Sequence, residues 1–263
     1  MNASYERLVN DFKSIGLCLG DMVVVHSSLK SMGYVDGGAE CVIEALKAVV
    51  GEEGTIIFPT FTYSSSYSDS YFSNKDTPSC VGYITEVFRH SDGVIRTNHP
   101  THSVAIWGSR KEELTDGIEL DDTPMGVHSP YRKLADFGAK IIMLGCSLSH
   151  NSFMHAMEEE AGVPYALRDH QQYTVVDENG NSSVRRIRRH NFVRPSGKHI
   201  HQRYDRSLDV LDEGDYKCAE IHGAPSVMMR CDALKAKACA RMKEEPLYFV
   251  DDPHGQYDEL RRR

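Results

Sequence analysis

The sequence lacks the features of a disulfide-stabilised or membrane-spanning protein. Its seven cysteines are scattered, odd in number and contain no CxxC pair, which argues against a disulfide framework and indicates reduced thiols. No apolar run approaches the roughly 20 residues that span a bilayer, and residues 1–12 are polar and amphipathic rather than signal-like. We therefore expect a cytoplasmic protein that does not engage a membrane.

Several short catalytic motifs are also missing. There is no Walker loop, GxGxxG fingerprint or HExxH helix. The run at residues 145–147 resembles part of a nucleophile elbow, but Ser149 stands where the second glycine of that motif would be. These absences disfavour a hydrolase and, despite 13 histidines, a metalloenzyme, so we expect no bound metal.

Charge is the next constraint on function. The net charge of −8 argues against a general nucleic-acid binder, although residues 185–206 contain eight Lys and Arg against the single Asp205. A following stretch is acidic at Asp205, Asp209, Asp212, Glu213 and Asp215. Solvated faces would explain both runs; alternatively, the basic run suits a nucleotide diphosphate and the acidic run a polycation.

The spacing of apolar residues predicts alternating strands and helices. Predicted strands are residues 22–25, 55–58, 94–96, 104–107 and 140–144, and predicted helices are residues 40–50, 82–90, 130–136 and 233–242. This alternation is typical of an α/β sheet with helices on its faces. Residues 63–78, rich in Ser, Tyr, Asn and Asp, are predicted to form a loop at the wall of a binding site.

The pattern becomes β-like after Pro164. Residues 172–176 and 183–190 flank a turn-forming sequence at residues 178–181, which predicts a β-hairpin. We expect residues 171–203 to form this hairpin or a small subdomain within a single domain that spans residues 1–263.

The stretch from Asn151 to Glu158 carries the strongest local signal for catalysis. In a helix, His155 and Glu158 lie on one face, so the carboxylate can orient the imidazole as a general base. A second histidine, His26, begins a loop rich in small residues that ends before a predicted helix. Its amides and hydroxyls suit a phosphate group, but an ordinary turn explains the same pattern equally well.

Five stretches, in this order, resemble the successive motifs of the aminoglycoside 3-N-acetyltransferase family: residues 26–33, 51–59, 96–108, 126–134 and 151–158. The resemblance implies an α/β fold with a mixed central sheet, helices on both faces and a β-rich C-terminal insertion. It also implies a transferase that uses acetyl-CoA, or another acyl-CoA, to acylate an amino group of an aminoglycoside-type amino sugar. Antibiotic resistance is the associated biological role.

The resemblance assigns roles to particular residues. The catalytic candidates are His155 as the base, Glu158 as its partner and His26 as a second residue at the thioester. The candidates for binding CoA are Ser27, Ser28, Leu29, Ser31, Ser103 and Val104. The candidates for contacting the acceptor are Asp76, Tyr63, His102 and Ser152, of which Ser152 stands where a threonine is usual and His102 where a small residue is common.

Two alternatives stay open at this stage. The loop between Thr60 and Gly82 is short compared with antibiotic-resistance members of the family, which questions the aminoglycoside acceptor. Residues 163–165 and the basic hairpin after them resemble family members that acylate nucleotide-linked amino sugars for surface polysaccharides. A non-catalytic protein that binds CoA or a sugar nucleotide would need the loop at His26 but not His155. The expected partners are CoA and a small amino-sugar acceptor, with a homodimer as a candidate assembly and no nucleic acid.

Overall fold

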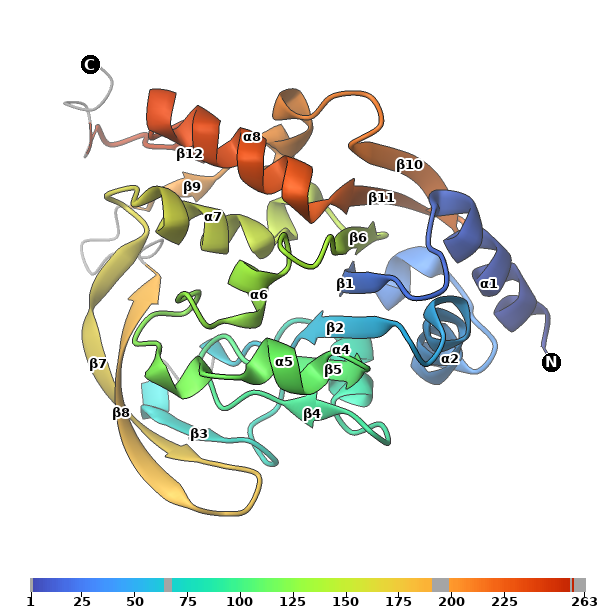
Figure 1. Ribbon diagram of the computed structural model, residues 1–263, viewed down its shortest axis with the longest axis horizontal. Helices are drawn as coiled ribbons and strands as arrows, with labels where there is room; N and C mark the ends of the chain where they lie inside the picture. Colours follow the sequence, from blue (N-terminus) through green and yellow to red (C-terminus); the bar gives the residue numbers. More distant parts are fainter. Residues whose placement is uncertain (1, 64–67, 191–198, 256, 258–263) are drawn as a thin grey trace.

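A seven-stranded mixed sheet forms the centre of the protein (Figure 1). The computed structural model describes residues 2–63, 68–190, 199–255 and 257. The strands, in the order β10-β11-β6-β1-β2-β5-β4, are β1 (Met22–Ser27), β2 (Thr55–Pro59), β4 (Ile95–Arg96), β5 (Val104–Gly108), β6 (Lys140–Leu144), β10 (Tyr216–Ile221) and β11 (Ala224–Arg230). Strand β1 is parallel to β2 and β6, whereas β5 and β11 are antiparallel to their neighbours. The predicted α/β fold with a mixed sheet is confirmed.

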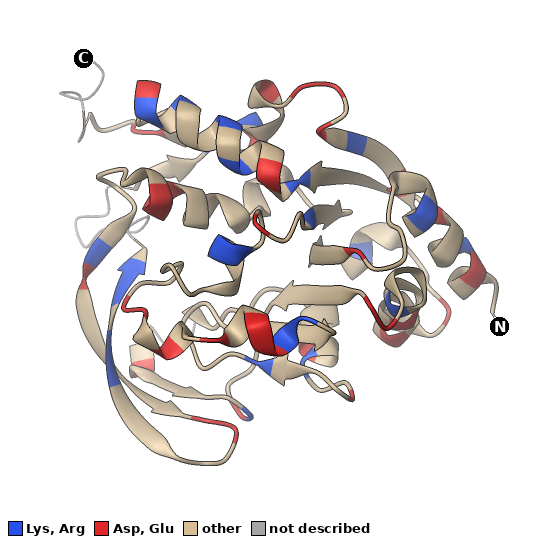
Figure 2. Ribbon diagram, viewed as in Figure 1, with Lys and Arg blue, Asp and Glu red and all other residues tan. Residues whose placement is uncertain are grey.

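Helices cover both faces of this sheet because its inner strands are apolar on both sides. In β1, Val23 and Val25 pack into one core, while Met22 and Val24 pack into the other. The first core contains α1 (Ala3–Ile15), α2 (Gly38–Val50) and α4 (Tyr83–Phe88). The second contains α5 (Lys111–Thr115), α6 (Pro130–Lys133), α7 (Phe153–Ala161) and α8 (Cys231–Glu244). Charged residues are absent from β1 and β2 and recur on α8 and the β-hairpin described next (Figure 2).

Two small sheets flank the central one. The predicted hairpin is confirmed as β7 (Leu167–Val176) and β8 (Ser182–His190), which pair antiparallel, although β7 begins before residue 172. Strand β3 (Tyr71–Ser73) pairs in parallel with β7 and buries Phe72 against the hairpin. The prediction of a loop throughout residues 63–78 was therefore wrong at β3. The second small sheet pairs β9 (His201–Gln202) with β12 (Val250–Asp251).

Short 3₁₀ turns complete the described chain: η1 (Leu29–Met32), η2 (Ile118–Leu120), η3 (Leu148–His150) and η4 (Tyr204–Val210). Residues 64–66 of the serine-rich stretch and Arg194 of the basic run lie outside the described residues. Within the described parts, none of the helices combines the length and the apolar character needed to cross a membrane.

Candidate active site

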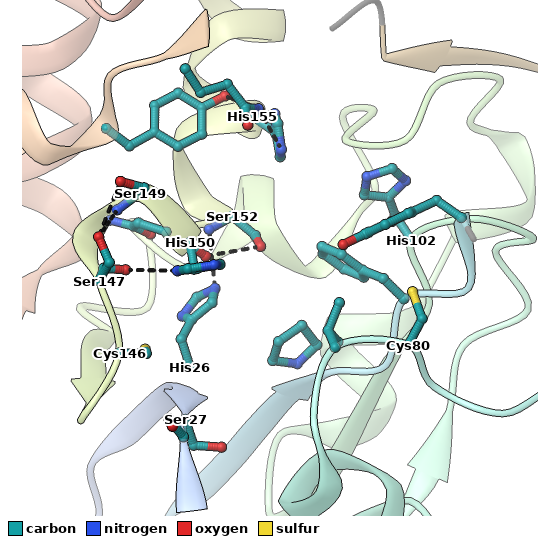
Figure 3. Close-up of a pocket in the computed structure, with 18 of the residues that line it drawn as sticks. His26, Ser27, Cys80, His102, Cys146, Ser147, Ser149, His150, Ser152 and His155 are labelled. Carbon is teal, nitrogen blue, oxygen red and sulfur yellow. Dashed lines mark hydrogen bonds between the residues drawn. The ribbon is translucent and has the colours of Figure 1, made fainter. Parts of the chain in front are cut away.

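A cavity of about 530 Å³ opens at the carboxyl ends of the parallel strands (Figure 3). Ser27 ends β1 and Pro59 ends β2, and both residues line the cavity together with Gly145, which follows β6. Open α/β sheets bind ligands at this edge because the strand ends deliver loops from several elements to one place. Gly145 has φ 61°, and an added Cβ would lie 2.9 Å from the Cβ atom of Ser31. Glycine is therefore required where β6 meets the first loop.

His155 faces this cavity from α7 and contacts Glu158, Tyr204 and Gln202, whose amide nitrogen lies 3.4 Å from His155 Nε2. Its Nδ1 lies 3.3 Å from Oε2 of Glu158, one turn further along the helix, as the spacing predicted. The same Nδ1 lies 2.9 Å from the Tyr204 hydroxyl, which donates a 2.6 Å hydrogen bond to Glu158 Oε2. The Glu158 side chain is only 1% exposed, and that of His155 is 13% exposed. The imidazole is thus fixed at one nitrogen by a buried carboxylate and a phenol.

This network determines the tautomer of His155. The Tyr204 proton is engaged by Glu158, so the phenol oxygen can only accept from the imidazole. The Glu158 carboxylate is likewise an acceptor. Nδ1 must therefore carry a proton, and in the neutral ring Nε2 then carries the lone pair. Such an imidazole can accept a proton at Nε2.

His26 also lines the cavity, but its contacts differ. Its Nε2 accepts a 3.0 Å hydrogen bond from the backbone N–H of Ser152, which immediately precedes α7. Burial, with His150 and His155 as lesser electrostatic causes, lowers the pKa of His26 to about 3. A neutral His26 therefore ties the end of β1 to the start of the helix that carries His155.

The depressed pKa of His26 predicts a loss of stability in acid. The unfolded residue gains a proton as the pH falls through its ordinary pKa, whereas the folded one gains it only near pH 3, so stability is present above about pH 6.5 and is lost below it. Between pH 7 and pH 5, this residue should lower the free energy of unfolding by about 2 kcal/mol. His26→Gln keeps an acceptor for Ser152 without titrating. Urea unfolding at both pH values should show that the variant loses less stability than the parent, and equal losses would contradict the assignment.

The predicted CoA-binding residues separate into two groups. Ser27 and Ser28 line the cavity, whereas Leu29 and Ser31 do not; Ser31 instead donates a 2.9 Å hydrogen bond to the Ser28 hydroxyl. Ser103 and Val104 lie in the core, 0% and 1% exposed, and neither lines the cavity.

Ser103 has a structural environment that sequence reasoning did not anticipate. Its hydroxyl donates to the Thr60 carbonyl at 2.7 Å and accepts from Arg96 Nε at 3.1 Å. Arg96 also donates to the carbonyl oxygens of Asn74, Thr77 and Thr60 at 2.8, 2.7 and 3.0 Å. This buried guanidinium joins β2, β4 and the loop after β3 behind the cavity wall.

Three of the four residues predicted to contact the acceptor line the cavity, and the fourth does not. Tyr63, His102 and Ser152 line the cavity, and the rings of Phe61 and His102 pack with centroids 4.5 Å apart. Asp76 is exposed, lies outside the cavity lining and accepts a 2.7 Å hydrogen bond from Ser73. Its carboxylate therefore stabilises the turn after β3.

Sequence reasoning missed several lining residues, of which Tyr204 matters most because it contacts both His155 and Glu158. Gln202 lies beside it, with its amide nitrogen 3.1 Å from the Tyr204 hydroxyl. Gln202 ends β9 and Tyr204 begins η4, 44 or more residues after His155 and Glu158. No local spacing in the sequence relates Tyr204 to α7.

Comparison with known proteins identifies the family of the chain. Residues 24–243 match the sequence profile of the family described as Aminoglycoside 3-N-acetyltransferase. The chain belongs to this family. The resemblance inferred from the five ordered motifs is confirmed.

Relatives in the family share moderate identity with the chain. It is 32% identical over 181 residues to the SPbeta prophage-derived aminoglycoside N(3')-acetyltransferase-like protein YokD of Bacillus subtilis, covering 61% of this chain and 65% of that protein. It is 30% identical over 178 residues to aminoglycoside N(3)-acetyltransferase VIII of Streptomyces fradiae, covering 60% and 61%. These matches span less than two thirds of the relatives' own length.

Solved structures extend the likeness across the whole fold. The crystal structure of YokD covers 93% of this chain and 94% of that chain, with a TM-score of 0.78 and 25% identity. The structure named AAC-IIIb binary with CoASH covers 92% and 97%, with a TM-score of 0.78 and 23% identity. The central sheet and its covering helices are therefore those of the family.

The charged runs contribute little to the cavity of this family member. Arg185 donates to the carbonyl oxygens of Glu119 and Asp121, and Arg188 donates to that of Arg168. In the acidic run, Asp205 pairs with Arg203, and Asp212 and Asp215 both pair with Lys237. Among the described residues that line the cavity, none is Asp, Glu, Lys or Arg. Arg185 and Arg188 are used structurally, which removes much of the charge argument for a nucleotide-linked substrate.

Proposed function

We propose that the protein is an acyl-CoA-dependent N-acyltransferase that transfers an acetyl or related acyl group from CoA to an amino group of an aminoglycoside-type amino sugar. The observation that carries the proposal is the presentation of His155 at the cavity, with Nδ1 engaged by Tyr204 and Glu158. Family membership and the names of the relatives support the same reaction class.

The chemistry requires a base because a sugar amine is largely protonated at neutral pH. His155 Nε2 accepts a proton from the amine, directly or through a water, an effect typically worth about 10²–10⁴-fold. The amine nitrogen attacks the thioester carbonyl, a C–N bond forms and the C–S bond breaks. The thiolate of CoA leaves and takes up the proton. Glu158 stabilises the imidazolium formed at His155, and this direct transfer needs no covalent enzyme intermediate.

CoA is proposed to occupy the edge of the cavity formed by the first loop. Ser27 and Ser28 line that edge, and Ser31 supports the Ser28 hydroxyl from behind. The related AAC-IIIb, whose structure is named as a binary complex with CoASH, supports a CoA site in this fold. Tyr63, His102 and Ser152, on the remaining cavity wall, are proposed to contact the acceptor.

An acyl-transfer assay with mass detection tests the proposal and avoids the background that seven cysteines would give with a thiol dye. Acetyl-CoA is offered with a deoxystreptamine aminoglycoside and, in parallel, with a dTDP-linked amino sugar. Acetylated aminoglycoside is the expected product. Product from the nucleotide sugar alone would overturn the acceptor assignment, and CoA binding without any product would favour a non-catalytic binding protein.

A further inference from the structure

Three histidines from separate parts of the chain meet beside the cavity, and two of them, His102 and His155, line it. His102 precedes β5, His155 lies in α7 and His190 ends β8. One ring nitrogen from each lies within 4.8 Å of those from the other two. The ring centroids of His155 and His190 are 4.3 Å apart, those of His102 and His190 4.6 Å, and those of His102 and His155 6.0 Å. The arrangement is a compact triad of imidazoles.

In each ring, one nitrogen is already engaged by an oxygen atom. His102 Nδ1 lies 2.8 Å from the Thr101 hydroxyl, and His190 Nε2 lies 2.8 Å from Oε1 of Glu159. His155 Nδ1 faces Glu158 and Tyr204, as described above. Metal-bound histidines characteristically present one nitrogen to the ion and the other to a carboxylate, hydroxyl or carbonyl, which fixes ring orientation and tautomer. The candidate ligand atoms are therefore Nε2 of His102, Nε2 of His155 and Nδ1 of His190. The Gln202 amide nitrogen, which lies 3.4 Å from His155 Nε2, would be displaced by the ion.

Buried carboxylates lie next to the triad: the side chains of Glu158 and Glu159 are 1% and 4% exposed. Glu158 and Glu159, both on α7, lie directly behind two of the rings and would offset part of the added positive charge.

We propose that His102, His155 and His190 bind a Zn²⁺ ion, whose fourth coordination position faces the cavity. Zinc binds imidazole nitrogen at about 2.0–2.1 Å, which places nitrogens of a tetrahedral site about 3.3 Å apart. The candidate ligand nitrogens lie within 4.8 Å of one another, and movement of each ring by about 1 Å would bring them to that separation. Three histidines with one open position suit Zn²⁺ better than the oxygen-preferring Mg²⁺ or Ca²⁺. This inference departs from the sequence-based expectation of no metal.

The site has a consequence for catalysis that rests on the proposed function. A zinc ion on His155 Nε2 occupies the lone pair that would accept the proton of the amine. Zn²⁺ should therefore inhibit acyl transfer reversibly, and a chelator should restore the activity.

Equilibrium dialysis of chelator-treated protein against Zn²⁺ alone tests the binding directly. The parent protein should bind one Zn²⁺ per chain, and His190→Asn should abolish this binding. Thr101→Val, which preserves shape while removing the hydroxyl behind His102, should weaken binding about 10–100-fold. His254→Gln, a change at an exposed histidine away from the triad, serves as the control and should bind as the parent does. Binding that is equal in the parent, His190→Asn and Thr101→Val proteins would overturn the proposal.

Cobalt substitution adds a readout of ligand type. Co²⁺ in the triad should give the visible bands of a tetrahedral site without a thiolate charge-transfer band, whereas ligation by cavity residues Cys80 or Cys146 would produce that band and contradict the assignment. Activity is measured separately. Zinc binding without acyl transfer under any condition would refute the proposed function but not the site. Acyl transfer without zinc binding would refute the site alone.

Discussion

Replacing His155 with asparagine should lower kcat/KM for acyl transfer about 10²–10⁴-fold while CoA still binds. Asparagine is a near match for the ring in size and polarity but cannot accept a proton at the position of Nε2. The measurements are steady-state kinetics with mass detection and calorimetric titration with CoA. His90→Asn is the matched control, because that histidine is 59% exposed and lies outside the cavity lining; its kinetics should equal those of the parent. A His155→Asn protein with parental turnover would exclude His155 as the base.

Substitutions of the two residues that contact His155 Nδ1 should lower the activity to different extents. Glu158→Gln removes the buried carboxylate that fixes the tautomer, and Tyr204→Phe removes only the hydroxyl that contacts both Glu158 and His155. We expect Tyr204→Phe to lose less activity than Glu158→Gln, because the Glu158 contact to Nδ1 remains. Both effects should fall mainly on kcat rather than on KM, since neither side chain is proposed to touch the substrates. An effect confined to KM would indicate a role in binding.

Replacing Arg96 with methionine should lower the free energy of unfolding by about 3–5 kcal/mol. The substitution leaves buried carbonyl oxygens of Asn74, Thr77 and Thr60 without their donor. Burial lowers the pKa of Arg96 to about 9, as expected of a cation removed from water. Chemical denaturation at pH 7 provides the measurement.

The control for Arg96 is the same substitution at an exposed site. Arg186→Met, on the solvent side of β8, should change stability by no more than about 0.5 kcal/mol. Similar losses in the two variants would mean that the carbonyl oxygens around Arg96 find other donors, and the structural role assigned to that residue would be wrong.

The sequence predicted the parts of the fold that depend on short-range patterns. Apolar runs located β1, β2, β5 and β6, and the turn chemistry at residues 178–181 located the hairpin. Helical spacing placed Glu158 beside His155. The antiparallel addition of β10 and β11 to the central sheet was not predicted, because strand pairing between residues 140–144 and 224–230 leaves no local signature.

At the candidate active site, too, the sequence could not reveal contacts that depend on tertiary packing. Ser103 and Val104 were assigned to CoA from a motif, but the buried position of β5 became visible only in the packed structure. Asp76 was assigned to the acceptor, yet it is engaged with Ser73 outside the cavity. Tyr204 was missed because its relation to α7 is purely tertiary. Charge counts along residues 185–206 left the substrate open, and they do not reveal that Arg185 donates to backbone carbonyl oxygens.

The distant origin of Tyr204 and His190 has a consequence for how such a site can diversify. The proposed base, His155, and its carboxylate, Glu158, lie together on α7, whereas His190 arrives from β8 and Tyr204 from η4. Substitutions in that later third of the chain can therefore change the surroundings of the imidazole while the helix that carries it stays unchanged.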